Sequence, residues 1–144
     1  MNRIMKILRI LLCSFFLISC ASARSDCPLA GKWKSNEKAT LEQMARYGGE
    51  IPEAVRKMLS TNFFGRVAIE YTCSNMTSYY DGNETGKDMK YDILKEEGNL
   101  FEIRYHAPDL YGGLTTVPIT LDGDCYCVPL NKHFAFSEVF CRVK

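Results

Sequence analysis

From Gly65 to the end of the chain, apolar and polar residues alternate with a period of two. In the first such segment Val67, Ile69 and Tyr71 fall on one side of the pattern and charged or polar residues on the other. Because successive side chains of a strand point to opposite faces, this alternation predicts strands with one buried face. Together with a short first strand, the pattern predicts eight strands, at 31–35, 65–73, 76–81, 89–93, 101–106, 117–121, 125–130 and 134–143.

Short turn segments separate several of these strands. Ser74-Asn75, residues 96–99 and Asp122-Gly123 each lie between two alternating runs, and Asp-Gly is a strong signal for a two-residue hairpin loop. Tight turns join antiparallel neighbours, and closing such a sheet removes its exposed edges. The predicted fold class is therefore mainly β: an eight-stranded antiparallel up-and-down β-barrel.

Between the first two strands the apolar period changes to that of a helix. Thr40 and Gln43 have the spacing of a capping box, Gly48-Gly49 would end this first helix, Pro52 suits the first position of a second, and Asn62 is suited to a left-handed stop. The sequence thus predicts a two-helix insertion after strand one. The residues with helical i, i+3, i+4 spacing are Leu41, Met44 and Ala45, then Val55, Met58 and Leu59.

The first twenty residues have the organisation of an export signal. Three basic residues and no acidic ones precede a short apolar run, which is too short for a membrane-spanning helix. Leu17-Ile18-Ser19-Cys20 resembles the bacterial lipobox, which implies a signal peptide at 1–19 and lipidation, with palmitate among the acyl chains, at Cys20. The alternative is cleavage after Ala23, which would release a soluble chain from Arg24. Residues 20–28 would form a short tether, and residues 29–144 the barrel domain.

Charge and cysteine content narrow the function classes. Removal of the signal leaves 15 basic and 17 acidic residues, a net charge of −2, which argues against a nucleic-acid partner. An exported chain of this kind is expected to form disulfides. The exported domain has five cysteines, an odd number, so one or two disulfides would leave at least one cysteine without a disulfide partner in the chain. These candidates are Cys27, Cys73, Cys125, Cys127 and Cys141.

Gly31-Lys32-Trp33 near the start of the domain, with Arg142 in the last strand, resembles the calycin pattern of lipocalins and fatty-acid-binding proteins. The resemblance implies that Trp33 packs against Arg142 where the barrel closes. The predicted helix pair after strand one is similar to that of fatty-acid-binding proteins, and the eight strands are similar to those of lipocalins. In layout the chain looks closest to small bacterial lipocalin-like lipoproteins.

The apolar strand faces supply the candidate ligand cavity. An eight-stranded barrel has room for side chains or for one small ligand, so a ligand cavity and a filled core both remain open. Arg104 and His106 share a polar strand face and are expected to be solvated. The candidate cavity residues are Tyr71, Tyr91, Phe101, Ile103, Tyr105, Val117 and Ile119.

Up-and-down topology places four cysteines, at positions 27, 73, 125 and 141, at the barrel end away from the helices. Pairing across an Asp122-Gly123 loop would set Ile119 opposite Tyr126 and turn Cys125 and Cys127 outward, whereas Cys73 would share the apolar face of its strand. We expect one or two disulfides, with Cys27 in one of them and the connectivity open. A soft-metal or redox site at Cys125-x-Cys127 is the alternative.

No catalytic motif, glycine-rich phosphate loop or metal-ligand spacing occurs in the sequence, so we expect no enzyme activity, no cofactor and no metal. The main hypothesis is a cell-envelope lipoprotein, held at the outer membrane by its lipid anchor and facing the periplasm or surface. Its barrel would bind a small apolar or amphipathic ligand, with residues 40–60 as a lid. The alternative is a closed barrel that binds or inhibits another protein. Phe63-Phe64 and Leu110-Tyr111 would serve as mouth or as contact patch.

Overall fold

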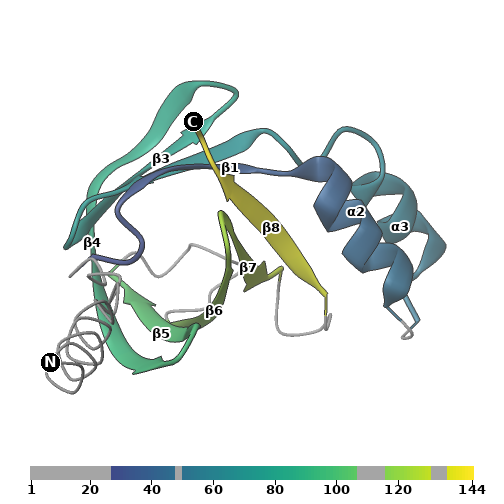
Figure 1. Ribbon diagram of the computed structural model, residues 1–144. Coiled ribbons are helices and arrows are strands. Elements are labelled where there is room, and N and C mark those ends of the chain that lie inside the picture. The colour runs from purple at the N-terminus through teal and green to yellow at the C-terminus, as the bar shows by residue number, and fades with distance from the viewer. Residues whose placement is uncertain (1–26, 48–49, 107–115, 131–135) are drawn as a thin grey trace, which may run out of the picture.

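The computed structural model describes residues 27–47, 50–106, 116–130 and 136–144, and it shows a closed eight-stranded antiparallel barrel with two helices beside it (Figure 1). Each strand pairs with the next along the chain, and the last pairs with the first, so the predicted fold class is confirmed. The elements are β1 (Gly31–Ser35), α2 (Glu37–Arg46), α3 (Glu53–Leu59), β2 (Val67–Tyr71), β3 (Asn75–Tyr80), β4 (Asn83–Glu97), β5 (Leu100–Tyr105), β6 (Thr116–Asp122), β7 (Cys125–Pro129) and β8 (Ser137–Arg142).

Strand β4 is three times as long as the segment predicted at 89–93, with 15 residues. Alternation failed to reveal its ends because nearly all of its side chains are exposed or half-buried, and only Tyr91 is buried. The turn before it was also missed. Asp81 and Gly82 connect Tyr80 to Asn83, and both have positive φ, of 51° and 81°. An Asp-Gly pair with two positive φ values is the preferred two-residue hairpin loop.

The predicted register of the β6–β7 hairpin is wrong, because the two-residue loop begins one residue later than predicted. Asp122 pairs with Cys125, so the loop is Gly123-Asp124, and Tyr126 lies opposite Leu121 rather than Ile119. Gly123 has a φ of 58° and takes the first loop position, where glycine adopts positive φ without steric strain. Thr120 pairs with Cys127 rather than with Cys125, but because the shift preserves the alternation, Cys127 still shares the face of Thr120 as predicted.

Helix α2 begins before the predicted capping box. Its N-cap is Asn36, whose Oδ1 accepts a hydrogen bond from the backbone N–H of Ala39 at 3.1 Å. Thr40 is instead buried against β8, where its Oγ1 accepts from the backbone N–H of Val139 at 2.9 Å. The Oε1 atom of Gln43 accepts a hydrogen bond from the backbone N–H of Ser137 at 3.4 Å. Helix α2 therefore supplies hydrogen bonds along β8 beyond the last residue of β1.

The remaining helix predictions are close. Helix α3 begins at Glu53, with Pro52 as its N-cap rather than its first residue. Asn62 has a φ of 53°, which confirms the predicted left-handed residue after this helix. The predicted stop at Gly48-Gly49 lies outside the described residues. The helices have their own small apolar cluster, which joins them to the segments flanking β7 and β8 and consists of Met44, Ile51, Leu59, Phe64 and Phe136.

Candidate functional site

A cavity of about 260 Å³ lies where the barrel interior meets the helix cluster. Ile69, Met76 and Phe140 belong to the barrel core and form its apolar wall, while Leu130 packs against the helix cluster. Phe63 follows α3, which places this cavity at the helix end of the barrel. Its lining is Phe63, Val67, Ile69, Met76, Ser78, Tyr80, Leu130, Glu138 and Phe140, and we call this space the Glu138 cavity.

Of the described residues in this lining, Glu138 is the one with a charged side chain, and only 8% of this residue is exposed. It shares the inward face of β8 with Phe140 because the two are two residues apart. Its Oε1 accepts a hydrogen bond of 2.6 Å from Ser35 Oγ, which also accepts the backbone N–H of Gly65 at 2.9 Å. Burial raises the pKa of the Glu138 carboxyl, and the hydrogen bond from Ser35 offsets part of that rise.

The outer end of the Glu138 cavity is marked by two exposed aromatic side chains. Phe63 and Tyr80 both line it, and each is 43% exposed. The Arg66 guanidinium lies over the Tyr80 ring, 4.5 Å from its centroid. Its Nε donates to both carboxylate oxygens of Asp81, at 2.9 and 3.0 Å. This pairing raises the pKa of Arg66 and lowers the pKa of Asp81, so both remain charged beside the mouth.

The structure places the seven candidate cavity residues together in the barrel core. All seven are buried and belong to one packed cluster, and none of them lines the Glu138 cavity. Within that cluster the hydroxyls of Tyr71 and Tyr105 lie 2.8 Å apart. Of the two predicted mouth segments, Phe63-Phe64 is split: Phe63 reaches the cavity and Phe64 packs in the helix cluster. Leu110-Tyr111 lies outside the described residues.

Trp33 and Arg142 meet where the barrel closes. They are direct partners in the β1–β8 pairing, and the guanidinium carbon lies 4.1 Å from the indole centroid. Trp33 is fully buried and donates from Nε1 to the Leu29 carbonyl at 2.7 Å, while Arg142 Nη1 donates to the Ala30 carbonyl at 2.6 Å. A Cβ at Gly31 would lie 2.5 Å from Arg142 Nη1, so the guanidinium occupies the space that glycine leaves.

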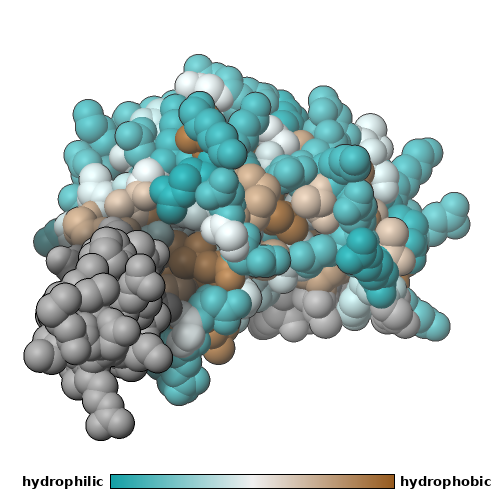
Figure 2. Space-filling view, in the orientation of Figure 1, coloured by the Kyte–Doolittle hydropathy of each residue, from teal (hydrophilic) through white to brown (hydrophobic). Residues whose placement is uncertain are grey.

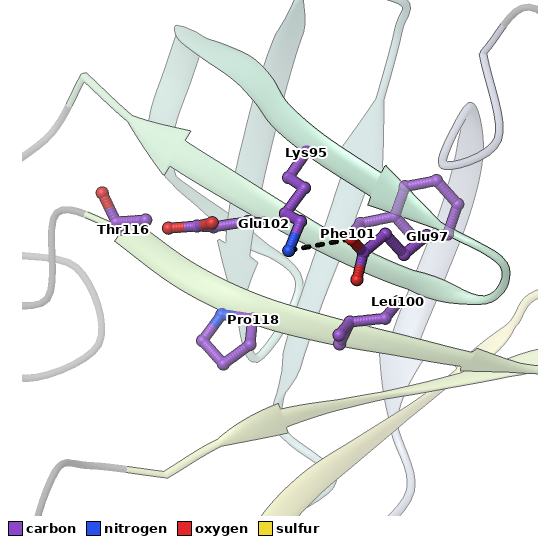
Figure 3. Close-up of a pocket in the computed structure, with 7 residues that line it drawn as sticks. All are labelled: Lys95, Glu97, Leu100, Phe101, Glu102, Thr116 and Pro118. Carbon is purple, nitrogen blue, oxygen red and sulfur yellow. Dashed lines mark ion pairs between the residues drawn. The ribbon is translucent and has the colours of Figure 1, made fainter.

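A second concavity lies on the outside of β4, β5 and β6 (Figure 3). Lys95 and Glu97 of β4 form an ion pair at 2.9 Å along one side of it, and the rest of its lining is Leu100, Phe101, Glu102, Thr116 and Pro118. Apart from Phe101 these residues sit on exposed or half-buried positions, so this outer groove holds no buried polar group. Figure 2 shows hydrophilic residues over most of one face of the molecule, with hydrophobic residues gathered in a hollow within it.

Two disulfides, Cys27–Cys73 and Cys125–Cys141, agree with the expected number and include Cys27. Cys127 is the free cysteine among the described residues. Cys73 is exposed beyond the end of β2, rather than on its apolar face, because the strand ends at Tyr71.

The second disulfide is not remote from the helices, contrary to prediction. Asn36 Nδ2 contacts Cys141 Sγ at 3.6 Å because the strands are staggered and Ser35, at the end of β1, pairs with Phe140. The alternative of a metal site at Cys125-x-Cys127 loses one thiolate to this bridge. Within the described residues, no group of three His, Cys, Asp or Glu side chains could hold a metal ion.

The chain was also compared with known proteins. No protein-family model, curated protein or solved structure matches it. The predicted signal peptide and lipidation site at Cys20 lie outside the described residues. In the part of the chain that is described, no helix has the length and apolar character needed to cross a membrane.

Proposed function

We propose that this protein is an exported lipocalin-like lipoprotein that binds one small apolar or amphipathic molecule in the Glu138 cavity. The observation that carries the proposal is an apolar cavity containing a single buried carboxyl group. Ligand sites in proteins are mostly apolar and have a few polar groups that orient the ligand. Burying a carboxyl group costs free energy, so a barrel without a ligand site would be expected to have an apolar side chain at position 138.

The size of the cavity limits the ligand. Its volume of about 260 Å³ is just below the usual range of about 300–1,000 Å³ for small-molecule sites. The ligand is therefore small, or it is longer and extends outward between Phe63 and Tyr80. Each buried methylene group would add about 0.8 kcal/mol of binding free energy, so a short alkyl chain is sufficient for measurable affinity.

Native mass spectrometry of the protein, produced from the full chain in an oxidising envelope, tests this proposal. We expect an additional mass that is lost on denaturation, or uptake of one molecule from an extract of envelope small molecules. Val67→Phe, which would fill the cavity, should abolish that uptake, and Thr116→Phe in the outer groove should leave it unchanged. An unliganded protein that takes up nothing from the extract would contradict a binding function.

The membrane anchor is tested separately. Metabolic labelling with palmitate should label the wild-type chain and should fail with Cys20→Ser, while Cys13→Ser, within the apolar run, should still be labelled. Absence of label on the wild type, with a mature N-terminus at Arg24, would support the soluble alternative and would leave the binding proposal intact.

The outer groove supports a second candidate function, a contact site for another protein. Leu100 of β5 lines this groove, and it is a large apolar residue with 40% of its surface exposed. Cross-linking in the envelope would capture a partner through this face, and Leu100→Glu would prevent it. If a partner is captured and the cavity takes up no ligand, the interaction function replaces the binding function.

A further inference from the structure

The charge lining the Glu138 cavity indicates the chemistry of its ligand. Resting on the proposed binding function, we propose that the ligand is a small amphipathic amine. Its protonated nitrogen would bind the Glu138 carboxylate, and its apolar part would pack against Ile69, Met76 and Phe140.

The sign of the charge in the cavity favours a cationic ligand. Among the described residues that line the cavity, Glu138 alone has a charged side chain, and the other polar groups are the hydroxyls of Ser78 and Tyr80. Arg66, whose guanidinium lies over the Tyr80 ring, is already engaged by Asp81. A fatty acid would bring a second carboxylate into this space with no described cation to receive it. An ammonium group would bring the missing opposite charge.

The hydrogen bonding of Glu138 leads to the same ligand class. A carboxylate offers about four acceptor positions on two oxygens. Ser35 is the hydrogen-bond donor to Glu138 among the described residues, and it donates to Oε1. Only 8% of the residue is exposed, so few water molecules can reach the remaining positions. An ammonium group carries three donors and could satisfy several of them at once.

Burial and the hydrogen bond from Ser35 account for the pKa of this carboxyl in the free protein. Burial raises the pKa of Glu138 and the hydrogen bond from Ser35 offsets part of that rise, with no contribution from a charged group among the described residues. Tyr80 is the other titratable group in the lining. The charged residues Lys32, Lys34 and Glu70 of β1 and β2 are exposed on the outer face, and α2 presents the neutral Thr40 and Gln43 to β8. A pH-dependent affinity would therefore report on Glu138.

Isothermal titration with hexylamine, hexanol and hexanoate tests the proposal, because these probes share one alkyl chain and differ in the head group. The protein is produced from the full chain, with buffer blanks for each probe. We expect hexylamine to bind wild type about tenfold or more tightly than hexanol, the size of a charged hydrogen bond, and hexanoate to bind most weakly. Glu138→Gln should remove the preference for the amine. Glu102→Gln, which removes one carboxylate from the outer groove, should preserve it.

A second measurement needs no variant. In wild type the affinity for hexylamine should fall as the pH is lowered through the raised pKa of Glu138, while the affinity for hexanol stays constant. Equal binding of amine and alcohol, or an amine preference that survives in Glu138→Gln, would overturn the inference and leave the cavity function standing. No binding of any probe to wild type would overturn both.

Discussion

Gly31→Ala is the most informative single substitution at the point where the barrel closes. Gly31 has a φ of 123°, and a Cβ there would lie 2.5 Å from Arg142 Nη1. Alanine in such a backbone conformation costs about 1–3 kcal/mol. The guanidinium would also be displaced from the Trp33 ring and from the Ala30 carbonyl. Together these contacts of a half-buried arginine contribute about 2 kcal/mol.

The expected loss for Gly31→Ala is therefore about 3–5 kcal/mol of unfolding free energy, out of the roughly 5–15 kcal/mol typical of a domain. Gly82→Ala is the matched control, because Gly82 also has a positive φ, of 81°, but a Cβ added there would meet no atom within 4 Å. It should lose only the backbone contribution of about 1–3 kcal/mol.

Guanidinium chloride unfolding, followed by the fluorescence of the single tryptophan with disulfides intact, measures these losses. In an Arg142→Ala background, Gly31→Ala should cost only the backbone contribution, so the two substitutions should be coupled by about 2 kcal/mol. Additivity within about 0.5 kcal/mol, or a loss no larger than that of Gly82→Ala, would refute the role given to this glycine.

Burial and connectivity lead to three other expectations. Because burial raises the folded-state pKa of Glu138 above its unfolded value, the native state keeps this proton longer. The unfolding free energy of the protein should therefore fall as the pH rises from the ordinary glutamate pKa through the raised pKa of Glu138. Urea unfolding of Glu138→Gln at the same pH values should show no such decrease. Replacing Cys27 and Cys73 by serine opens a bridge spanning 46 residues and should cost about 4 kcal/mol in denaturant unfolding, whereas no loss would contradict stabilisation through loop entropy. Val67→Phe should weaken hexanol binding about tenfold or more with the circular dichroism spectrum unchanged, and retained affinity would exclude this cavity as the binding site.

The architecture was predictable because each strand of a closed barrel has one buried face, which alternation reveals directly. It was least predictable where that condition fails, as in β4, whose side chains are almost all exposed or half-buried. Helix α2 was misjudged for a different reason. Asn36 and Thr40 can both serve as caps, and only the hydrogen bond from Val139 to Thr40 shows which of them packs against β8.

The candidate site was only partly accessible from sequence. The apolar faces identified residues that the structure places in the packed core, but not the polar group of the cavity. A signal for it was present: Glu138 stands between Phe136 and Phe140, so a carboxylate occupies the apolar side of an alternating strand. Its partner Ser35 holds the same inward position two residues after Trp33. The pairing of these two residues depends on barrel stagger, which local patterns do not encode.

Methyl NMR of the labelled protein titrated with hexylamine tests the central claim most directly. We expect the methyl signals of Ile69 and Met76, which line the Glu138 cavity, to shift in a saturable way. Those of Leu94 and Leu100 on the outer surface should not move. Saturable shifts confined to the outer pair, or no shift in either set, would contradict a ligand site inside the barrel.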